Sequence, residues 1–210
     1  MKEKSVALDI RDNMNPFGRI VKRVFDFIFS FLALMILLPV FIVVAIMLLC
    51  QGDGSVFFKQ ERIGYRGKPF NIIKFRTMRT DSESNGEPRL AQVNDERLTK
   101  VGKFLREHHL DELPQLVNVL KGDMSFVGPR PERSYFIEKI RKVNPNYDYL
   151  YLMRPGLTSI ATLQNGYTDT FEKMLKRLDM DLEYLQKRSL WLDVKLIFMT
   201  FYNIVKGKKF

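Results

Sequence analysis

The chain has 210 residues, and its 34 Lys and Arg exceed its 24 Asp and Glu to give a formal net charge of +10. This length leaves room for one compact domain besides a membrane segment, and it makes a second domain unexpected. The single cysteine, Cys50, excludes a disulfide framework within the chain and indicates a reducing compartment. The positive charge suits an anionic membrane face, a phosphorylated substrate or nucleic acid equally well.

The first 51 residues divide into a polar arm and a membrane segment. Residues 1–18 are polar and uneven, which predicts a loosely held arm. Residues 19–51 contain a run of 24 residues without any charge, at positions 27–50. A helix of that length would cover about 36 Å, enough for the ~30 Å hydrocarbon core of a bilayer. Residues 52–210 are then expected to form a cytoplasmic domain.

Two features bear on how this helix meets the membrane. Lys and Arg flank both of its ends, and positive flanks remain cytoplasmic. Pro39 removes a backbone donor and splits the run into arms of about 18 and 16 Å, each too short to cross. Both features favour a re-entrant helix broken at Pro39, with Ser30 as a partner for the carbonyl freed near Met35. The alternative is an ordinary spanning anchor kinked at the proline.

The next elements follow from periodicity and turn residues. Residues 56–64 and 70–76 alternate around a turn that contains glycine, which predicts a β-hairpin. The polar stretch 80–88 predicts a mobile loop that could cover a site. Residues 98–105 have helical spacing, and Pro114 and Gly122 mark the two ends of a second helix.

Asp111 and Glu112 stand immediately before that second helix. Unpaired backbone donors and the helix dipole favour ionised carboxylates there by about 0.3–1 kcal/mol, so we expect both to be charged at neutral pH. An ionised aspartate can act as a nucleophile, and adjacent carboxylates can hold Mg²⁺ beside a phosphate. The simpler explanation is an acidic helix start that only caps. Basic residues cluster around the pair in sequence at Lys74, Arg76 and Arg106, and for these the simpler explanation is a solvated surface.

Arg130 lies between Pro129 and Pro131 at the end of a short apolar stretch. Each proline fixes its own φ and restricts the residue before it, so Arg130 has little backbone freedom. A rigidly held guanidinium suits bidentate recognition of a phosphate or a carboxylate. A stiff connector with an incidental surface arginine is the alternative.

The C-terminal part is rich in apolar and aromatic residues. Residues 182–205 include Trp191 and precede a basic tail, a composition typical of a helix in the membrane interface. A core helix of the domain is the alternative. Tyr147, Tyr149 and Tyr151 alternate along the chain, which predicts either residues at head-group depth or an edge strand.

Five motifs carry a family resemblance. They are KRVFD (22–26), KFRTM (74–78), LDELPQL (110–116), GDMSFVGPRP (122–131) and RPGLT (154–158). In this order they resemble the bacterial sugar transferase family, in the form of a small monotopic phosphoglycosyl transferase. The resemblance covers the chain from about residue 16. It implies an α+β, mainly helical fold with an N-terminal re-entrant membrane helix, a short β-hairpin and interfacial amphipathic helices.

The resemblance also implies a reaction and its residues. A sugar 1-phosphate would move from a nucleoside diphosphate sugar, expected to be a UDP-sugar, to polyprenol (undecaprenyl) phosphate, with release of the nucleoside monophosphate. Asp111 would attack the phosphorus that bears the sugar, and Glu112 would help to bind Mg²⁺ or position the acceptor. Lys74, Arg106 and Arg130 would bind the donor phosphates.

The resemblance places the enzyme at the bacterial inner membrane, with its catalytic domain on the cytoplasmic face among membrane lipids. It says nothing of the oligomeric state, and no recognisable nucleic-acid motif accompanies the basic charge. The competing hypothesis is a basic, membrane-tethered binding module without chemistry. Such a module would explain the charge and the anchor, but neither an acidic pair among basic residues nor an arginine between two prolines.

Overall fold

The computed structural model describes residues 10–52, 54–80, 82, 90, 92, 95–166 and 168–207. The fold is mostly helical, as expected, and it contains two small sheets, of which the hairpin was expected and the second was not. The helices are α1 (Pro16–Gln51), α2 (Lys100–Glu107), α3 (Gln115–Lys121), α4 (Ser134–Val143), α5 (Ile160–Asn165), α6 (Phe171–Lys187) and α7 (Leu190–Val205). The strands are β1 (Phe57–Ile63), β2 (Pro69–Phe75), β3 (Ser125–Val127) and β4 (Gly156–Thr158), and the 3₁₀ helices are η1 (Tyr65–Gly67), η2 (Leu110–Glu112) and η3 (Pro145–Leu152). Most of the predicted polar loop at 80–88 lies outside the described residues.

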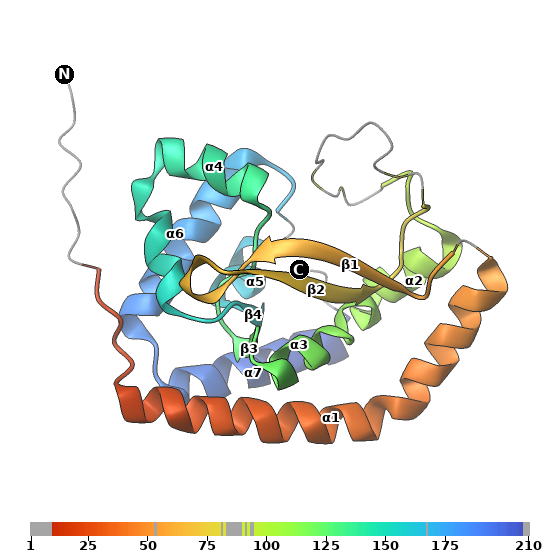
Figure 1. The fold of residues 1–210 in the computed structure, drawn as a ribbon, viewed down its shortest axis with the longest axis horizontal. Coiled ribbons are helices and arrows are strands. Elements are labelled where there is room, and N and C mark those ends of the chain that lie inside the picture. The colour runs from red at the N-terminus through yellow and green to blue at the C-terminus, as the bar shows by residue number, and fades with distance from the viewer. Residues whose placement is uncertain are drawn as a thin grey trace.

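Helix α1 runs beneath the rest of the molecule and bends upward at the right of Figure 1. Pro39 lies inside it without ending it, so the predicted break is a bend in a continuous helix of 36 residues. The hydroxyl of Ser30 donates to the carbonyl of Phe27 at 3.1 Å, so the predicted pairing with the carbonyl near Met35 is wrong. By length and composition, α1 is the one helix among the described residues that could cross a membrane.

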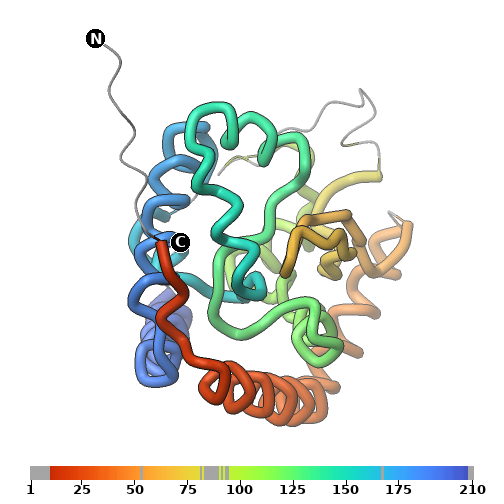
Figure 2. The backbone as a smooth tube through the Cα atoms, turned by 60° about the vertical axis from the view of Figure 1, so that its left-hand side comes forward, coloured from red at the N-terminus to blue at the C-terminus, as the bar shows by residue number. Residues whose placement is uncertain are grey.

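Both halves of α1 are attached to the same domain. In the first half, the guanidinium of Arg23 donates to the carbonyls of the last turn of α3 at 2.7 and 2.8 Å. In the second half, Val44 and Leu48 pack in a buried cluster with Phe75 of β2 and Leu105 of α2. Figure 2 shows α1 as a layer below the domain, next to α7. The helix is therefore part of the folded core as well as an apolar surface.

Strands β1 and β2 form the predicted hairpin. They pair antiparallel from Phe57 opposite Phe75 to Ile63 opposite Pro69, and η1 closes the turn. The hairpin crosses the front of the molecule in Figure 1. The second sheet is a short parallel pair, with Ser125 of β3 opposite Gly156 of β4.

The main hydrophobic core joins α4, η3 and α6, and includes Leu196 of α7. Tyr147 lies in this core on the 3₁₀ helix η3, so the predicted edge strand is wrong: the alternating tyrosines follow a helical path. The segment 182–205 spans two helices, because Arg188 ends α6 and the hydroxyl of Ser189 caps α7. Residues of α6 such as Leu185 are buried, whereas Trp191 of α7 is 78% exposed.

Candidate active site

The acidic pair lies on a sharp turn between two helices. Helix α2 ends at Glu107, its C-cap residue is His108, and Nδ1 of the His108 ring donates to the carbonyl of Phe104 at 2.9 Å. His109 adopts a positive φ of 55° and redirects the chain into η2, which carries Asp111 and Glu112. Helix α3 begins just beyond, at Gln115. The turn thus places the pair between the end of α2 and the start of α3.

Glu112 is bonded to two of the predicted cations. The ammonium of Lys74 on β2 donates to Oε1 of Glu112 at 2.6 Å, and the guanidinium of Arg130 donates to the same oxygen at 2.9 Å. In the sequence, Lys74 is 38 positions before Glu112, and Arg130 is 18 positions after it. The structure therefore brings Lys74, Glu112 and Arg130 together.

Burial and charge act in opposite directions on Glu112. Burial alone would raise its pKa, but Arg130 and Lys74 outweigh that effect and hold the pKa well below the usual range of a glutamate. The pKa of Lys74 is lowered by burial, although Glu112 opposes the change. Glu112 is therefore ionised at neutral pH, as expected.

Asp111 differs from its neighbour. It is buried, and this burial raises its pKa, although the positive charges of Lys74, Arg106 and Arg130 oppose the rise. The pKa of Asp111 thus moves in the direction opposite to the one that a helix start favours, because the loss of solvent outweighs the positive charges around the carboxylate. The result is an aspartate with a raised pKa that faces three cations.

Arg106 approaches the pair from the last turn of α2. Its Nε donates to the hydroxyl of Thr77 at 3.1 Å, just past the end of β2. Gly102, one turn earlier, packs so closely on the backbone of Thr77 that an added Cβ would lie 1.9 Å from the Thr77 carbonyl oxygen. Helix α2 and the end of β2 are thus fixed together, which keeps Arg106 near Asp111.

The segment that holds Arg130 is anchored by residues that the sequence analysis missed. Glu132 follows Pro131 and is buried, where it pairs with Arg177 of α6 and, at 3.4 Å, with Arg62 of β1. The backbone of Ile63 also donates to the carbonyl of Glu132 at 3.0 Å. The available signal was the position of Glu132, directly after the proline-flanked arginine.

Helix α1 supports the site from below. The carboxylate of Asp26 accepts from the backbone N–H of Phe126 on β3 at 3.1 Å, which ties α1 to β3. Lys22 pairs with Asp193 of α7 at 2.6 Å. These contacts fix α1, β3 and α7 relative to one another beneath the acidic pair.

The site offers few carboxylate ligands for a metal ion among the described residues. Among the described residues there is no group of three or more His, Cys, Asp or Glu side chains that could hold a metal ion. Asp111 and Glu112 are the adjacent carboxylates at this site. A divalent cation would therefore need further ligands from a substrate.

Comparisons with known proteins agree with the motifs. The family model described as "Bacterial sugar transferase" matches residues 17–207. The chain is 43% identical, over 90% of its length, to a UDP-glucose:undecaprenyl-phosphate glucose-1-phosphate transferase of Klebsiella pneumoniae, and it covers 41% of that protein. It is 37% identical, over 92% of its length, to a UDP-N-acetylgalactosamine-undecaprenyl-phosphate N-acetylgalactosaminephosphotransferase of Aeromonas hydrophila, of which it covers 45%.

A relative whose length is closer to that of this chain has the same kind of name. A UDP-glucose:undecaprenyl-phosphate glucose-1-phosphate transferase of Caulobacter vibrioides is 39% identical over 93% of this chain, which covers 70% of it. The chain thus spans less than half of the Klebsiella and Aeromonas proteins and about two thirds of the Caulobacter protein. The family model, which matches nearly the whole length, identifies this chain as a member of the bacterial sugar transferase family.

Proposed function

We propose that this chain transfers a sugar 1-phosphate from a nucleoside diphosphate sugar, of the UDP-sugar class, to undecaprenyl phosphate. The nucleoside monophosphate would be released, and the product would be the first lipid-linked intermediate of a surface glycan. The observation that carries the proposal is the buried Asp111 beside Glu112, with Lys74 and Arg130 bonded to Glu112. The names of the relatives, which specify UDP-sugars and undecaprenyl phosphate, support the choice of substrates.

The reaction would proceed in two displacements. A carboxylate oxygen of Asp111 attacks the phosphorus that bears the sugar, the bond from that phosphorus to the bridging oxygen breaks, and the nucleoside monophosphate leaves with the electron pair. A phosphate oxygen of the lipid then attacks the same phosphorus, and the bond to Asp111 breaks. A diphosphate linkage forms, and the Asp111 carboxylate is restored.

The cations would serve the first displacement. Charge on the transferring phosphoryl group is stabilised by preorganised positive groups, and Lys74, Arg106 and Arg130 face the Asp111 carboxylate as such groups. The two prolines beside Arg130 hold its backbone, so little ordering is left for the moment of binding. Glu112 would keep Lys74 and Arg130 in place until the donor arrives.

The carboxylates fit Mg²⁺ in one of its usual binding modes. Mg²⁺ is commonly held by one or two carboxylates and completed by substrate phosphates and water, which matches the adjacent Asp111 and Glu112. When bound, the ion would offset negative charge on the donor diphosphate. Asp111 and Glu112 are the residues that would hold it.

We infer that α1 is re-entrant and that the domain lies on the cytoplasmic face of the bacterial inner membrane. A spanning helix would place its two ends on opposite sides of the bilayer, whereas here Arg23 near one end and Leu48 near the other both contact the same domain. The bend at Pro39 and the positive flanks support the same topology. The exposed apolar side of α7, with Trp191, Phe198 and Phe201, would lie in the interface with membrane lipids.

The test is release of nucleoside monophosphate by purified protein in nanodiscs that contain undecaprenyl phosphate and Mg²⁺, with a panel of nucleoside diphosphate sugars. We expect release with at least one UDP-sugar, and with donor alone an adduct of sugar-phosphate mass on Asp111. Asp111→Asn should abolish both, whereas Asp148→Asn, which alters an exposed surface pair, should change neither. Release that persists in Asp111→Asn would disprove the mechanism, and no release with any donor would favour the binding-module alternative.

A further inference from the structure

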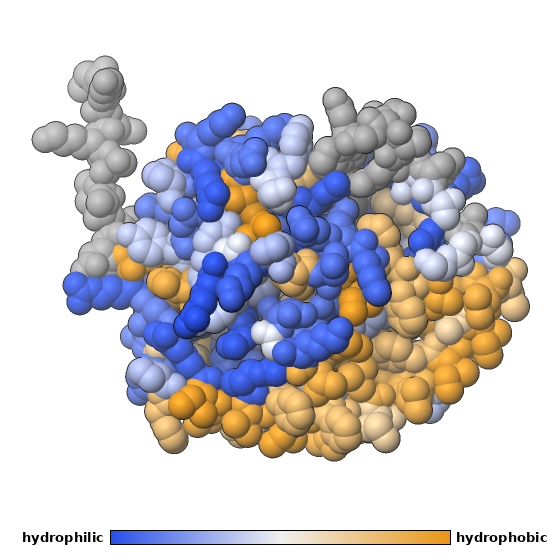
Figure 3. All heavy atoms as spheres, viewed as in Figure 1, coloured by the Kyte–Doolittle hydropathy of each residue, from blue (hydrophilic) through white to orange (hydrophobic). Residues whose placement is uncertain are grey.

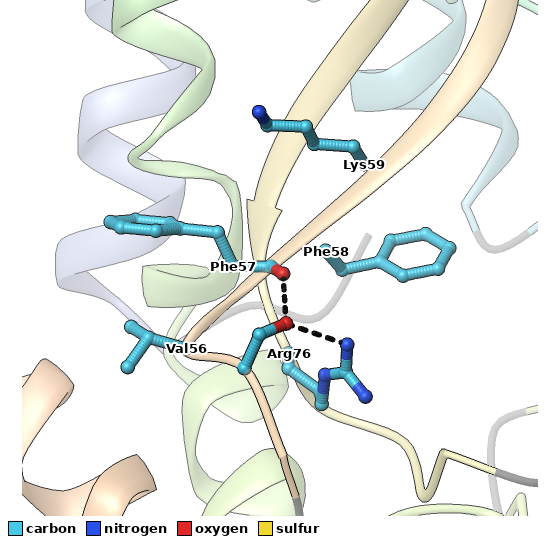
Figure 4. Close-up of a pocket in the computed structure, with 6 residues that line it drawn as sticks. Val56, Phe57, Phe58, Lys59 and Arg76 are labelled. Carbon is cyan, nitrogen blue, oxygen red and sulfur yellow. Dashed lines mark hydrogen bonds between the residues drawn. The ribbon is translucent and has the colours of Figure 1, made fainter.

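A basic and aromatic depression lies where α1 passes into the hairpin. After the C-cap of α1 at Gly52, the chain turns through Ser55 into β1, and Arg76 follows the last residue of β2. The depression is lined by Ser55, Val56, Phe57, Phe58, Lys59 and Arg76 (Figure 4). It lies next to the site of Asp111 but uses other residues.

Arg76 is held in a fixed place there. Its backbone N–H donates to the carbonyl of Val56 at 2.9 Å, which continues the ladder of the hairpin. Its guanidinium donates to the hydroxyl of Ser55 at 2.8 Å, and that hydroxyl donates to the carbonyl of Phe57 at 2.8 Å. The side chain is thus oriented by a neutral partner, not by a carboxylate.

Among the described residues, Arg76 has no carboxylate partner of the kind that Lys74 and Arg130 have. Lys74 and Arg130 pair with Glu112, but within the described part of the chain no carboxylate lies within 4.0 Å of Arg76. Its Nε is buried and makes no hydrogen bond to a described residue. A buried donor without an acceptor is costly, so this guanidinium is suited to receive an anion from outside the chain.

The position of Arg76 connects this depression with the acidic pair. Residues two apart on a strand point to the same face, so Arg76 and Lys74 share one face of the hairpin, about 7 Å apart along the chain. Phe58 is the cross-strand partner of Lys74 and lies on that face too. In Figure 4 the Phe58 ring and the Arg76 guanidinium lie on one side of the hairpin, and the Phe57 ring lies on the other.

The surroundings specify an amphiphilic ligand. Phe58 is exposed, and the second half of α1, which packs against Phe75 on the other face of the hairpin, exposes further apolar side chains, such as Ile46 and Leu49. The apolar surface along the bottom and right of Figure 3 borders the blue, polar front of the domain. An anion that reaches Arg76 from this border would carry an apolar chain that lies against Phe58.

We propose that Arg76, supported by Ser55, binds the phosphate of the isoprenoid lipid acceptor, and that Phe58 contacts the first part of its apolar chain. This inference rests on the proposed function and adds the acceptor subsite to it. A lipid phosphate bound at Arg76 would lie near Lys74, which is two residues earlier on the strand. Lys74 is bonded to Glu112, and Glu112 is next to the aspartyl phosphosugar in the sequence. An oxygen of the lipid phosphate then displaces the Asp111 carboxylate from phosphorus, one P–O bond forming as the other breaks.

The test separates the two half-reactions in Arg76→Gln. The burst of nucleoside monophosphate with donor alone should match wild type, because the first displacement does not use the acceptor. The KM for undecaprenyl phosphate should rise at least tenfold, and the KM for the donor should stay within twofold. Arg79→Gln, an equivalent change at an exposed arginine three residues on, should leave both KM values unchanged. Equal changes in both KM values, or no change in the acceptor KM, would overturn the proposal.

A second measurement does not depend on activity. Farnesyl phosphate should raise the apparent unfolding temperature of the wild-type protein in neutral detergent, whereas farnesol and inorganic phosphate should not, and Arg76→Gln should lose the rise. If phosphatidylglycerol gives the same rise as farnesyl phosphate, Arg76 binds bulk anionic lipid and the proposal is wrong. If the wild-type protein releases no nucleoside monophosphate with any donor, the proposed function fails. This binding assay would still decide whether Arg76 binds a lipid phosphate.

Discussion

Two adjacent carboxyl groups, Asp111 and Glu112, illustrate how strongly the local surroundings decide the charge of a side chain. Both lie on η2, but Asp111 is buried, whereas Glu112 is partly exposed and accepts hydrogen bonds from Lys74 and Arg130. The pKa of Glu112 is therefore lowered, whereas that of Asp111 is raised. The sequence indicated an acidic pair near cations, but a dipole argument alone could not reveal this difference, because it depends on burial and on hydrogen-bond partners from distant segments.

The raised pKa of Asp111 leads to a prediction about pH. Only the ionised form can attack phosphorus, so the rate of the first half-reaction should fall on acidification at a pH above the value of about 3.9 for an ordinary aspartate. Glu112→Gln removes a negative charge that raises the pKa of Asp111, so the acid limb should move to lower pH even though the rate falls. Rapid-quench measurements of the burst across pH would check this, and an acid limb that moves to higher pH in Glu112→Gln would contradict it.

Asp181 of α6 provides a second prediction about pH, this time for stability. It is buried, and burial raises its pKa to about 7, although Arg177 opposes the rise. Since an unfolded aspartate has a pKa of about 3.9, the folded protein binds more protons between these values. The stabilising contribution is thus present at low pH and is lost as the pH rises from about 4 to about 7.

Asp181→Asn should therefore raise the unfolding temperature at pH 8 and change it little at pH 4. The upper limit of the gain, for a shift of about three pH units, is about 4 kcal/mol. Asp179→Asn, at a more exposed position of the same helix, should have a smaller effect. Scanning fluorimetry of both variants at the two pH values would measure this. A lower unfolding temperature of Asp181→Asn at pH 8 would show that its charge stabilises the fold.

At the scale of elements, the segment after β3 depends on an ion pair buried under α6. Glu132 pairs with Arg177 and Arg62, and the side chains of Glu132 and Arg177 are less than a tenth exposed. Glu132→Gln would remove the carboxylate that pairs with both Arg177 and Arg62, which should destabilise the protein by about 3–5 kcal/mol. It should also lower activity, because the same segment carries Arg130. Chemical unfolding in a neutral detergent would measure the loss.

The matched control for that variant is an exposed pair. Glu183 and Lys187 on α6 form an i, i+4 pair whose side chains are more than half exposed. Glu183→Gln should therefore cost only about 0.3–0.5 kcal/mol. Similar losses in Glu132→Gln and Glu183→Gln would show that the buried pair has no special role in holding the Arg130 segment.

The elements differed in how well the sequence predicted them. The hairpin followed from alternation around a glycine turn, and α3 from Pro114 and Gly122, because these signals are local. One prediction failed where a local pattern had two explanations, because the alternating tyrosines fit a strand or a 3₁₀ helix. The apolar stretch at 182–205 contains both predicted kinds of helix, since the cap at Ser189 divides the buried end of α6 from the exposed α7. The pairing of Lys74 with Glu112, 38 positions away, has no local signal at all.

At the scale of the whole molecule, the re-entrant topology can be tested by labelling. Single cysteines at Arg11 and Glu61, in a Cys50→Ala background, lie on opposite sides of α1 in the sequence and are both exposed. In intact inner-membrane vesicles of known orientation, both should react with an impermeant maleimide from the cytoplasmic side only. Reaction of the two positions from opposite sides would establish a spanning helix.

Because α1 covers the last carbonyls of α3 and completes the cluster around Phe75 and Leu105, it cannot be treated as a detachable tether. Shortened versions that start after Gly52 would leave those carbonyls and that apolar cluster open to water, and we expect them to aggregate instead of yielding a soluble enzyme. A preparation of the intact protein should therefore keep α1, with lipid or a detergent belt around its exposed apolar side chains.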